Sequence, residues 1–282
     1  MENRRMCPHC RAFIKTSDRV CPYCETKVGP RAIDRHQPGV ILGGLIPHAH
    51  FTTTLILFIN FGLFAAMVLY SLGANPNAFM NLDADTLSNF GAKDLEKIVL
   101  YGHWWRLITA GFLHGGLMHL LMNSWVLFDL GAQVEEIYGA SRLIVIYFLA
   151  TVFGFYASAW WSPALSMGAS AGLFGLIGAM IALSLKHPMG ASFRGLYIRW
   201  AIYGLLLGLL GPFFGLYLDN AAHVGGLIAG FGFAYLAGTP KLVSAWGERF
   251  WRLAAYFCVF LTALAFLRMY LWFASLGRLI RP

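Results

Sequence analysis

The sequence predicts an all-α polytopic membrane protein with a small metal-binding segment at its amino end. Composition is the first reason: 58% of the 282 residues are hydrophobic and 12% are charged, whereas soluble domains are roughly 45–50% apolar and 25% charged. The second is a series of apolar stretches near the roughly 20 residues that an α-helix needs to cross a bilayer. The third is that four of the five cysteines lie within the first 24 residues.

The amino-terminal cysteines are spaced like metal ligands. Cys7-Pro-His-Cys10 is followed, after ten residues, by Cys21-Pro-Tyr-Cys24, and two such turns can bring four thiolates to one tetrahedral zinc ion. A segment of roughly 30 residues has too small a core to fold without such a staple. Redox-active or unliganded thiols are the alternative. We therefore expect residues 1–28 to form a zinc-ribbon-like domain with structural zinc, and we expect this polar start to be retained rather than cleaved as a signal peptide.

Residues 29–50 are rich in glycine and proline and predict a linker. Seven apolar spans follow, at 51–72, 107–129, 143–160, 170–185, 198–217, 221–238 and 251–276. The fourth and fifth are short or broken by glycine, so six spans with one re-entrant segment is the alternative. We expect residues 51–240 to form the membrane core, and residues 241–282 to form a charged linker followed by an additional, seventh transmembrane helix.

Positive charge sets the expected orientation. Lysine and arginine in short loops prefer the cytoplasmic side of a membrane, and eight of them precede the first span. Acidic residues outnumber basic ones between residues 73 and 100. The net charge of +8 is thus explained by membrane orientation, and a nucleic-acid partner has no further support. We expect a multi-pass integral protein of a prokaryotic plasma (inner) membrane, with a cytoplasmic amino terminus and the lipid bilayer as its partner; an organelle membrane is the alternative.

Ser170 is the first candidate for chemistry within the spans. A serine in a membrane helix usually bonds back to its own helix backbone. Ser170, however, follows a segment of helix breakers that ends in Gly168, and the apolar run begins only after it. It is therefore expected at a helix amino terminus, where free N–H groups can stabilise an oxyanion. The match to the GxSxG pattern of soluble hydrolases carries little weight, because that motif requires a preceding strand.

His223 is the expected partner of Ser170. Small residues recur at four-residue steps after Ser170, and the sixth span repeats this pattern at Ala222, Gly226 and Gly230. Such steps allow two helices to approach closely, which would bring His223 within reach of the Ser170 hydroxyl as its general base. A buried neutral histidine bonded to a carbonyl is the alternative reading. Asp129 and Asp219 lie at the ends of spans, so we expect a dyad, with Phe174 stacking on the imidazole.

Three further polar residues lie in the sequence GFLHGGLMHLLMNSW. His119 and Asn123 are four residues apart and share one face of a helix, whereas His114 lies roughly 140° from His119. A zinc protease would need a glutamate between histidines at i and i+4, and none is present here. Asn123 and His119 are therefore expected to donate hydrogen bonds to an oxyanion. Packing between helices remains an alternative for Asn123, and a structural role remains one for His114.

Taken together, these residues resemble the rhomboid family over residues 51–238. Trp105-Arg106 resembles its WR motif, His114 to Asn123 its HxxxxHxxxN signature, Gly168-Ala-Ser170-Ala its GxSG, and Ala222 to Gly230 its AHxxGxxxG. The resemblance implies a six-helix core and an intramembrane serine endopeptidase without a catalytic cofactor. Ser170 would be the nucleophile and His223 the base, with His119 and Asn123 assisting the oxyanion. It also implies substrates with a single transmembrane helix, cleaved near the external end.

The chain departs from the family pattern in two respects. Ala171 replaces the usual glycine after the nucleophile, and its methyl group is expected to narrow the oxyanion site, with Gly172 compensating. The amino-terminal ribbon and the seventh span lie outside the family signature, so no role is carried over to them.

Two other classes compete with the protease. The first is a catalytically inactive rhomboid-like protein that binds membrane helices, which would normally lack the serine or the histidine. The second is a transporter or channel in which the histidines relay protons. That class usually shows membrane carboxylates or internal symmetry, and neither is clear in this sequence.

Overall fold

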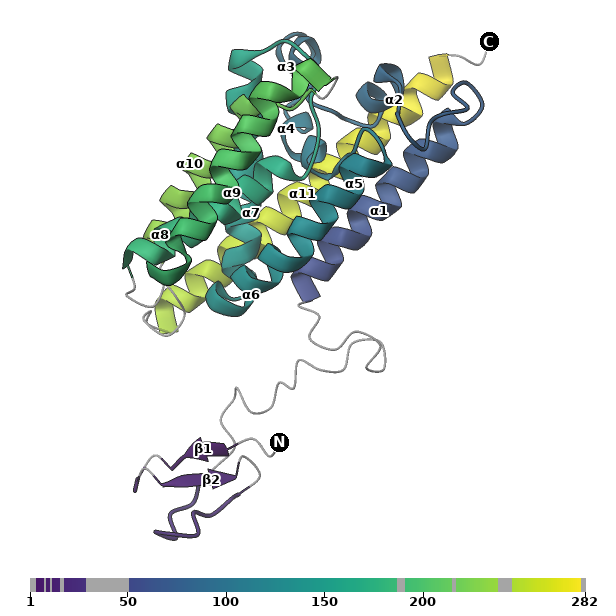
Figure 1. Cartoon of the computed structure of the whole chain (residues 1–282). Coiled ribbons are helices and arrows are strands. Elements are labelled where there is room, and N and C mark those ends of the chain that lie inside the picture. Colours follow the sequence, from purple (N-terminus) through teal and green to yellow (C-terminus); the bar gives the residue numbers. More distant parts are fainter. Residues whose placement is uncertain are drawn as a thin grey trace. The chain divides into compact units, whose positions relative to one another are not determined.

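The computed structural model describes residues 4–7, 9–10, 12–15, 18–28, 51–186, 191–214, 217–237 and 245–279. The chain divides into two compact units, Met1–Ala49 and His50–Pro282 (Figure 1). The predicted linker at 29–50 lies outside the described residues, as does the stretch 241–244 before the last helix. The two units are therefore described separately.

The first unit is a small β-structure around its cysteines. Strand β1 (Arg4–Met6) pairs antiparallel with β2 (Phe13–Lys15). The turns that begin at Cys7 and Cys21 are each closed by a backbone hydrogen bond. The Cys7 amide donates to the Ala12 carbonyl (2.8 Å), and the Cys21 amide donates to the Thr26 carbonyl (2.9 Å). The buried side chains of this unit are Cys7, Ile14, Cys21 and Val28. Because this core is so small, the cysteines form much of the interior of the unit.

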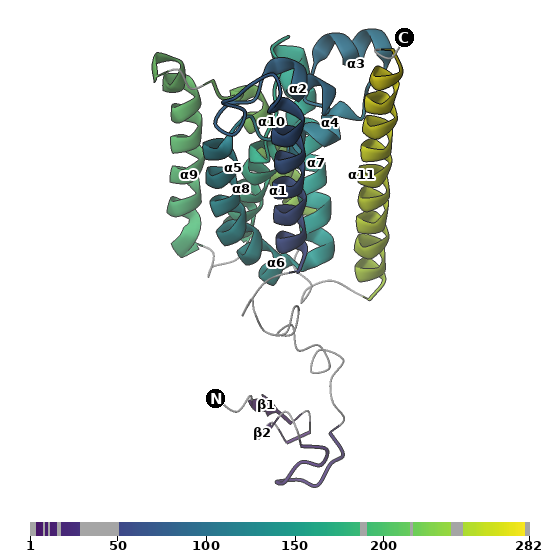
Figure 2. The same cartoon turned by 90° about the vertical axis from the view of Figure 1, so that its right-hand side faces the viewer.

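The described regular elements of the second unit are helices, joined by loops that include one isolated β-bridge between Lys93 and Ser166. Its elements are α1 (Phe51–Ser71), α2 (Ala84–Asn89), α3 (Leu95–Tyr101), α4 (Arg106–Thr109), η3 (Ala110–Phe112), α5 (Leu117–Val126), η4 (Leu127–Gly131), α6 (Ala132–Tyr138), α7 (Ala140–Trp161), α8 (Ser170–Lys186), α9 (Ala191–Leu210), η6 (Gly211–Phe214), α10 (Asn220–Ala237) and α11 (Ala245–Leu279). Figure 2 shows the long helices side by side, with α2 and α3 at one end of the bundle and α6 at the other.

Four of the described helices, α1, α7, α9 and α11, are long and apolar enough to cross a membrane. Helix α8 is apolar but has only 17 residues, twelve of which are buried. It contacts α7, α9 and α10. A helix that other helices enclose can be shorter than the bilayer, because its ends are covered by protein rather than lipid. The protein is thus an all-α polytopic membrane protein, apart from its small amino-terminal unit.

The second span differs from its predicted position at 107–129. Its helix begins at Leu117 and runs through α5, the π-helical turn η4 and α6 to Tyr138. The chain approaches other backbone closely at Gly116, where a β-carbon would lie 2.1 Å from the Met80 carbonyl oxygen. Residues 106–112 instead form the short helices α4 and η3, most of whose residues are buried. Hydropathy alone cannot distinguish a buried short helix from a membrane span.

A carboxylate in α6 holds the start of α1. Glu135 is buried and accepts hydrogen bonds from the backbone amides of Thr52 and Thr53, each at 3.0 Å, and from the Thr53 hydroxyl at 2.9 Å. The first N–H groups of a helix lack partners within the helix, and negative charge is favoured there. Glu135 thus ties the first membrane helix to the end of the second.

Helices α8 and α10 approach closely along their small residues, as the sequence predicts. A β-carbon on Gly226 would lie 2.1 Å from the Ala171 carbonyl oxygen, and one on Gly230 would lie 2.1 Å from the Gly175 carbonyl oxygen. Real β-carbons do not approach backbone oxygens so closely. Only glycine therefore fits at these two positions of α10, and the two backbones touch without intervening side chains.

The predicted seventh helix is a single helix, α11, that is attached near both ends. Near its start, Glu248 accepts two hydrogen bonds from the buried Arg142 of α7, at 2.7 and 3.1 Å. Near its other end, the ring of Trp272 packs edge-on against His103, with centroids 4.7 Å apart. Cys258 is buried between these points in an apolar cluster with Val145 and Ala255, so it contributes to packing.

The contact between α8 and α10 predicts a selective effect of small substitutions. Gly230→Ala would place a methyl group against the backbone of α8 and should lower the free energy of unfolding by about 1–3 kcal/mol. Gly232→Ala lies in the same helix with nothing within 4 Å of its added carbon, and it should leave stability unchanged or raise it by up to about 1 kcal/mol. Reversible unfolding of both variants in one detergent measures the difference. Equal stability of the two would contradict the close contact.

Candidate active site

Ser170 and His223 meet at the interface between α8 and α10. Ser170 is the first residue of α8, and His223 lies in the first turn of α10. The Ser170 Oγ and His223 Nε2 atoms are 2.9 Å apart, within hydrogen-bond distance. His223 is buried and Ser170 is half-buried. Chemically, this arrangement allows a hydroxyl to lose its proton to an imidazole as it attacks a substrate.

A ring stacks on the imidazole from one side. Phe174, one turn after Ser170 in α8, lies parallel to His223, with ring centroids 4.2 Å apart and planes 6° apart. On the same ring, a β-carbon at Gly204 of α9 would lie 2.5 Å from the Phe174 Cζ atom. Three helices therefore restrict where the imidazole can lie. The stacking matches the arrangement expected from the sequence.

The Nδ1 atom of His223 is buried and has no hydrogen-bond partner among the described residues. No carboxylate in this part of the chain therefore bonds the imidazole. Asp219 instead stabilises the start of α10. Its side chain accepts from the Ala222 amide (3.0 Å) and from the Ser158 hydroxyl, and its carbonyl accepts from the His223 amide (3.0 Å). Asp219 thus orients the turn that carries His223, and it does so through the backbone.

Gly168 lets the turn before Ser170 pass close to His119. Its φ angle of +134° is one that residues with side chains rarely adopt. A β-carbon here would lie 2.8 Å from the His119 Nε2 atom and 3.5 Å from the Ser170 Oγ atom. The amide of Gly168 donates to the Ala110 carbonyl (2.9 Å), which holds the turn in place. The close approach of His119 to this turn therefore depends on a glycine, and polar atoms of both His119 and Ser170 lie next to it.

The other polar residues singled out from the sequence lie in α5 or directly before it, and their hydrogen-bond partners differ. His119 lies in the first turn of α5, and its Nδ1 atom accepts a long hydrogen bond from the Gly115 amide (3.5 Å). The Asn123 Nδ2 atom donates to the His119 carbonyl (2.9 Å), which leaves its second N–H for another acceptor. His114 lies before α5 and packs edge-on against His119, with centroids 5.1 Å apart. It is fully buried, and neither ring nitrogen has a partner among the described residues.

The expectation that Ala171 narrows this site is wrong. The methyl group of Ala171 points toward α7, where a β-carbon on Gly154 would lie 2.9 Å from it. Ala171 is buried in a cluster with Ala110, Phe155 and Ala222. On a helix, successive residues point about 100° apart, so the residue after Ser170 faces a neighbouring helix. The methyl group of Ala171 therefore packs between helices.

Two buried cations support the loops near Ser170: Lys93 holds the segment that leads to Ser170, and Arg106 holds the first loop. The sequence did not indicate either role. Lys93 is fully buried, and its Nζ atom donates to the carbonyls of Ser162 (2.9 Å) and Ala164 (2.6 Å). Its backbone forms a two-bond bridge with Ser166. Arg106 is also fully buried, and its Nη1 atom donates to the carbonyls of Ser88 (2.7 Å) and Ala92 (3.0 Å). The loop between α1 and α4 thus supports the segment before α8.

The four amino-terminal cysteines form a second candidate site in the first unit. Their sulfur atoms all lie within 4.8 Å of one another, with Cys7 and Cys24 at 3.7 Å and Cys10 and Cys21 at 3.6 Å. Hydrogen bonding with the side chain and backbone of Thr26 lowers the pKa of the Cys24 thiol to about 5, whereas the pKa of the Cys10 thiol is raised to about 12. A low pKa favours the thiolate, which is the form that binds metal. These cysteines could hold one metal ion.

Comparison with known proteins places the membrane unit in a family. A model of the rhomboid domain matches residues 101–240. Rhomboid protease GluP of Bacillus subtilis is 35% identical over 201 residues, which are 70% of this chain and 37% of that protein. RHOMBOID-like protein 6, mitochondrial, of Arabidopsis thaliana is 37% identical over 162 residues, 55% of this chain and 50% of that protein.

One similar protein carries a different description. Inactive RHOMBOID-like protein 8 of Arabidopsis thaliana is 34% identical over 164 residues, 56% of this chain and 45% of that protein. The chain therefore spans half or less of the length of these three relatives. The domain match includes the helices from α4 to α10 and thus both Ser170 and His223. With this match and these relatives, the chain belongs to the rhomboid family.

Proposed function

We propose that this protein is an intramembrane serine endopeptidase that cleaves transmembrane segments of membrane proteins with a Ser170/His223 dyad. The observation that carries the proposal is the 2.9 Å contact between the Ser170 Oγ and His223 Nε2 atoms at the start of two closely packed membrane helices. Membership of the rhomboid family supports it. No cofactor is needed for this chemistry.

In the first step, the Ser170 oxygen attacks the carbonyl carbon of the scissile peptide bond while its proton passes to the His223 Nε2 atom. The carbonyl oxygen becomes an oxyanion, and the space beside Gly168 is where we place it. Because Nδ1 of His119 accepts from the Gly115 amide, the proton of a neutral His119 lies on Nε2, the atom that faces this space. The spare N–H of Asn123 and the first N–H groups of α8 are further donors.

The intermediate then collapses, and the bond between carbonyl carbon and nitrogen breaks. His223 returns the proton to the leaving amine, so the amino-side fragment remains bound to Ser170 as an ester. Water repeats the sequence: it loses a proton to His223, attacks the ester carbon, and releases the new carboxyl end as Ser170 is protonated again. Phe174 keeps the imidazole in place through both proton transfers. His114 supports His119 by packing.

The substrates proposed here are proteins with a single transmembrane helix, cleaved near the end of the helix that faces the first loop. Ser170 lies directly after the segment that Lys93 of this loop holds. A peptide bond within an intact helix is shielded by its own backbone hydrogen bonds, so the substrate must unwind locally before attack. Helix-breaking residues near the cut should therefore increase cleavage.

We predict that both members of the dyad are required for cleavage. Purified protein in liposomes should cleave a model single-span substrate, and Ser170→Ala or His223→Ala should lower the rate by roughly 10³-fold or more, as for other serine–histidine sites. Ser166→Ala is a matched control, because Ser166 lies four residues earlier and is held through its backbone. It should keep most of the activity.

Different results would identify the alternatives. Cleavage that survives Ser170→Ala would exclude this serine as the nucleophile. If the unmodified protein binds single-span substrates but cuts none of a broad panel, it would be an inactive helix-binding relative. A similar Arabidopsis protein is inactive by name.

We further propose that the four clustered cysteines bind one structural zinc ion and that this unit lies in the cytoplasm of a prokaryotic cell, with the helices in its inner membrane. The sulfur positions support the first statement, because tetrahedral thiolate sites favour zinc. The positive charge before residue 51 supports the second. Zinc would serve folding of the small unit and take no part in the cleavage.

The zinc proposal predicts about one zinc ion per purified chain, lost when Cys7 and Cys10 are both changed to serine. Cys258→Ser should retain the zinc, because Cys258 lies in α11. Elemental analysis of the three proteins measures this, and zinc retained in the double variant would contradict it.

In sealed inside-out vesicles a membrane-impermeant protease should remove the cysteine-containing unit. Full protection there, with removal from right-side-out vesicles, would reverse the proposed orientation.

A further inference from the structure

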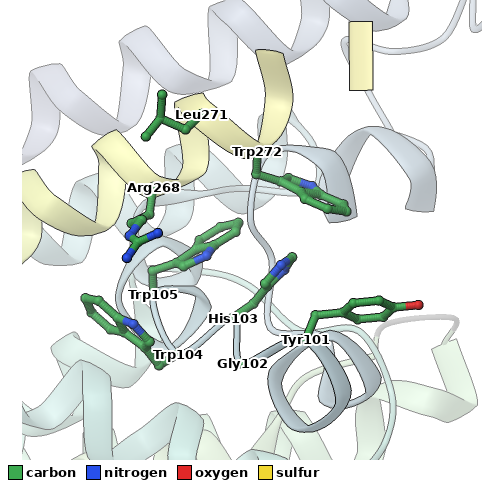
Figure 3. A pocket seen from close by; sticks show the side chains of 8 residues that line it. All are labelled: Tyr101, Gly102, His103, Trp104, Trp105, Arg268, Leu271 and Trp272. Atoms are coloured by element: carbon green, nitrogen blue, oxygen red, sulfur yellow. The ribbon is translucent and has the colours of Figure 1, made fainter. Parts of the chain in front are cut away.

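A pocket of about 470 Å³ lies between the outer half of α11 and the end of the first loop. Figure 3 shows Arg268 and Trp272 reaching from α11 toward Trp105 and His103. The remaining side chains around it are mainly aromatic, namely Tyr101 and Trp104. The site lies apart from Ser170 and His223, neither of which lines it. The mechanism proposed above makes no use of these residues.

The pocket presents hydrogen-bond donors. Arg268 is exposed and offers a guanidinium group with five N–H donors. The Nε1 atom of Trp272 is buried and has no hydrogen-bond partner among the described residues, although an indole N–H of this kind normally finds an acceptor. An acceptor supplied from outside the chain would satisfy it. Two donors from successive turns of one helix thus reach the same space.

His103 adds a third donor. Its ring lies between Trp105, stacked with centroids 5.1 Å apart, and Trp272. Burial, and then the charge of Arg106, lowers the pKa of His103, so the ring is neutral at pH 7. The Nδ1 atom accepts a hydrogen bond from the Arg106 Nε atom (3.3 Å), which leaves the proton on Nε2.

The electrostatics of the pocket favour an anion. Among the described residues, no acidic side chain lines it. Arg268 contributes one positive charge, and the Cζ atom of Arg106 lies over the Trp105 ring, 4.6 Å from its centroid. Asp94, which acts on His103 through space, is already paired with Lys97 at 3.4 Å. The planar guanidinium group of arginine and the N–H group of an indole can both donate hydrogen bonds to phosphate oxygens.

The position along α11 indicates where that phosphate comes from. Residues 253–267 carry no charge, and Arg252 and Arg268 flank them. The 16 helical steps from Arg252 to Arg268 rise about 24 Å, close to the roughly 30 Å hydrocarbon core of a bilayer. If Arg252 lies at one membrane surface, the Arg268 side chain can reach the other, where lipid headgroups and an aromatic belt are found.

We propose that this pocket binds the phosphodiester group of a glycerophospholipid from the leaflet next to the first loop, with the Arg268 guanidinium and the N–H groups of Trp272 and His103 on its oxygens. The acyl chains would lie along the exposed apolar surface of α11, which includes Leu267 and Leu271. The bound lipid would then join α11 to the loop that supports the segment before Ser170.

Native mass spectrometry of the full chain in detergent tests this with dioleoylphosphatidylglycerol as the probe. The first lipid should bind Arg268→Gln roughly tenfold or more weakly than wild type, because hydrogen bonds to a charged group are lost. Arg252→Gln makes the same charge change at the other end of α11, outside the pocket. This variant should bind the lipid with an affinity within about twofold of wild type. Trp272→Phe keeps a ring but loses the N–H donor, and should weaken binding less than Arg268→Gln.

Two control ligands distinguish a phospholipid from an apolar ligand and from free phosphate. Dioleoylglycerol has the same chains without phosphate and should not distinguish wild type from Arg268→Gln; equal discrimination would mean an apolar groove and overturn the proposal. Inorganic phosphate should not displace the lipid, and displacement at millimolar concentration would assign the site to a soluble phosphate instead. Unchanged lipid binding by a folded Arg268→Gln variant would also overturn it. Because lipid binding is measured without substrate, these outcomes do not depend on protease activity.

Discussion

The close backbone contact between α8 and α10 is the constraint on which the rest of the membrane unit depends. Gly226 and Gly230 allow α10 to touch the carbonyls of Ala171 and Gly175, and this contact sets the distance between the first turns of both helices. Ser170 and His223 lie in those turns, 2.9 Å apart. A side chain between the helices would separate them, so the packing that stabilises the bundle also creates the geometry of the proposed dyad. Phe174 and the turn capped by Asp219 then orient the imidazole without a contacting carboxylate.

A second set of contacts holds the segments around the site. Glycine at 168 allows His119 to lie close to the turn before Ser170, and Lys93 and Arg106 fix the nearby loops through backbone carbonyls. Burying two cations is costly unless their donors are bonded, and each is bonded to two or more acceptors here, while the Nη2 atom of Arg106 has no partner among the described residues. The first loop is thus a structural support of the segment before α8. Through His103 and Trp272 the same loop also contacts α11, which connects the additional helix to this support.

The sequence was informative where chemistry repeats at a fixed spacing. Small residues at four-residue steps predicted the contact between α8 and α10, and paired CxxC turns predicted the cysteine cluster that is observed. It failed where the outcome depends on three-dimensional neighbours. The second membrane helix begins at Leu117, ten residues later than predicted, after the chain packs against Met80 at Gly116. The Ala171 methyl group faces α7 and not the proposed oxyanion site. Lys93 lies in a polar loop and looks solvated in sequence, and only the fold shows that it is buried.

The central claim is that the packing of α8 on α10 makes Ser170 a nucleophile activated by His223. Labelling with a fluorophosphonate tests it most directly, because the reagent forms a covalent bond with an activated serine and releases fluoride, and it needs no knowledge of the natural substrate. Peptide mass spectrometry should find the adduct on Ser170 of the wild-type protein and little or none in a folded His223→Ala variant. Labelling of Ser170 at an undiminished rate without His223, or labelling only at another residue, would contradict the account.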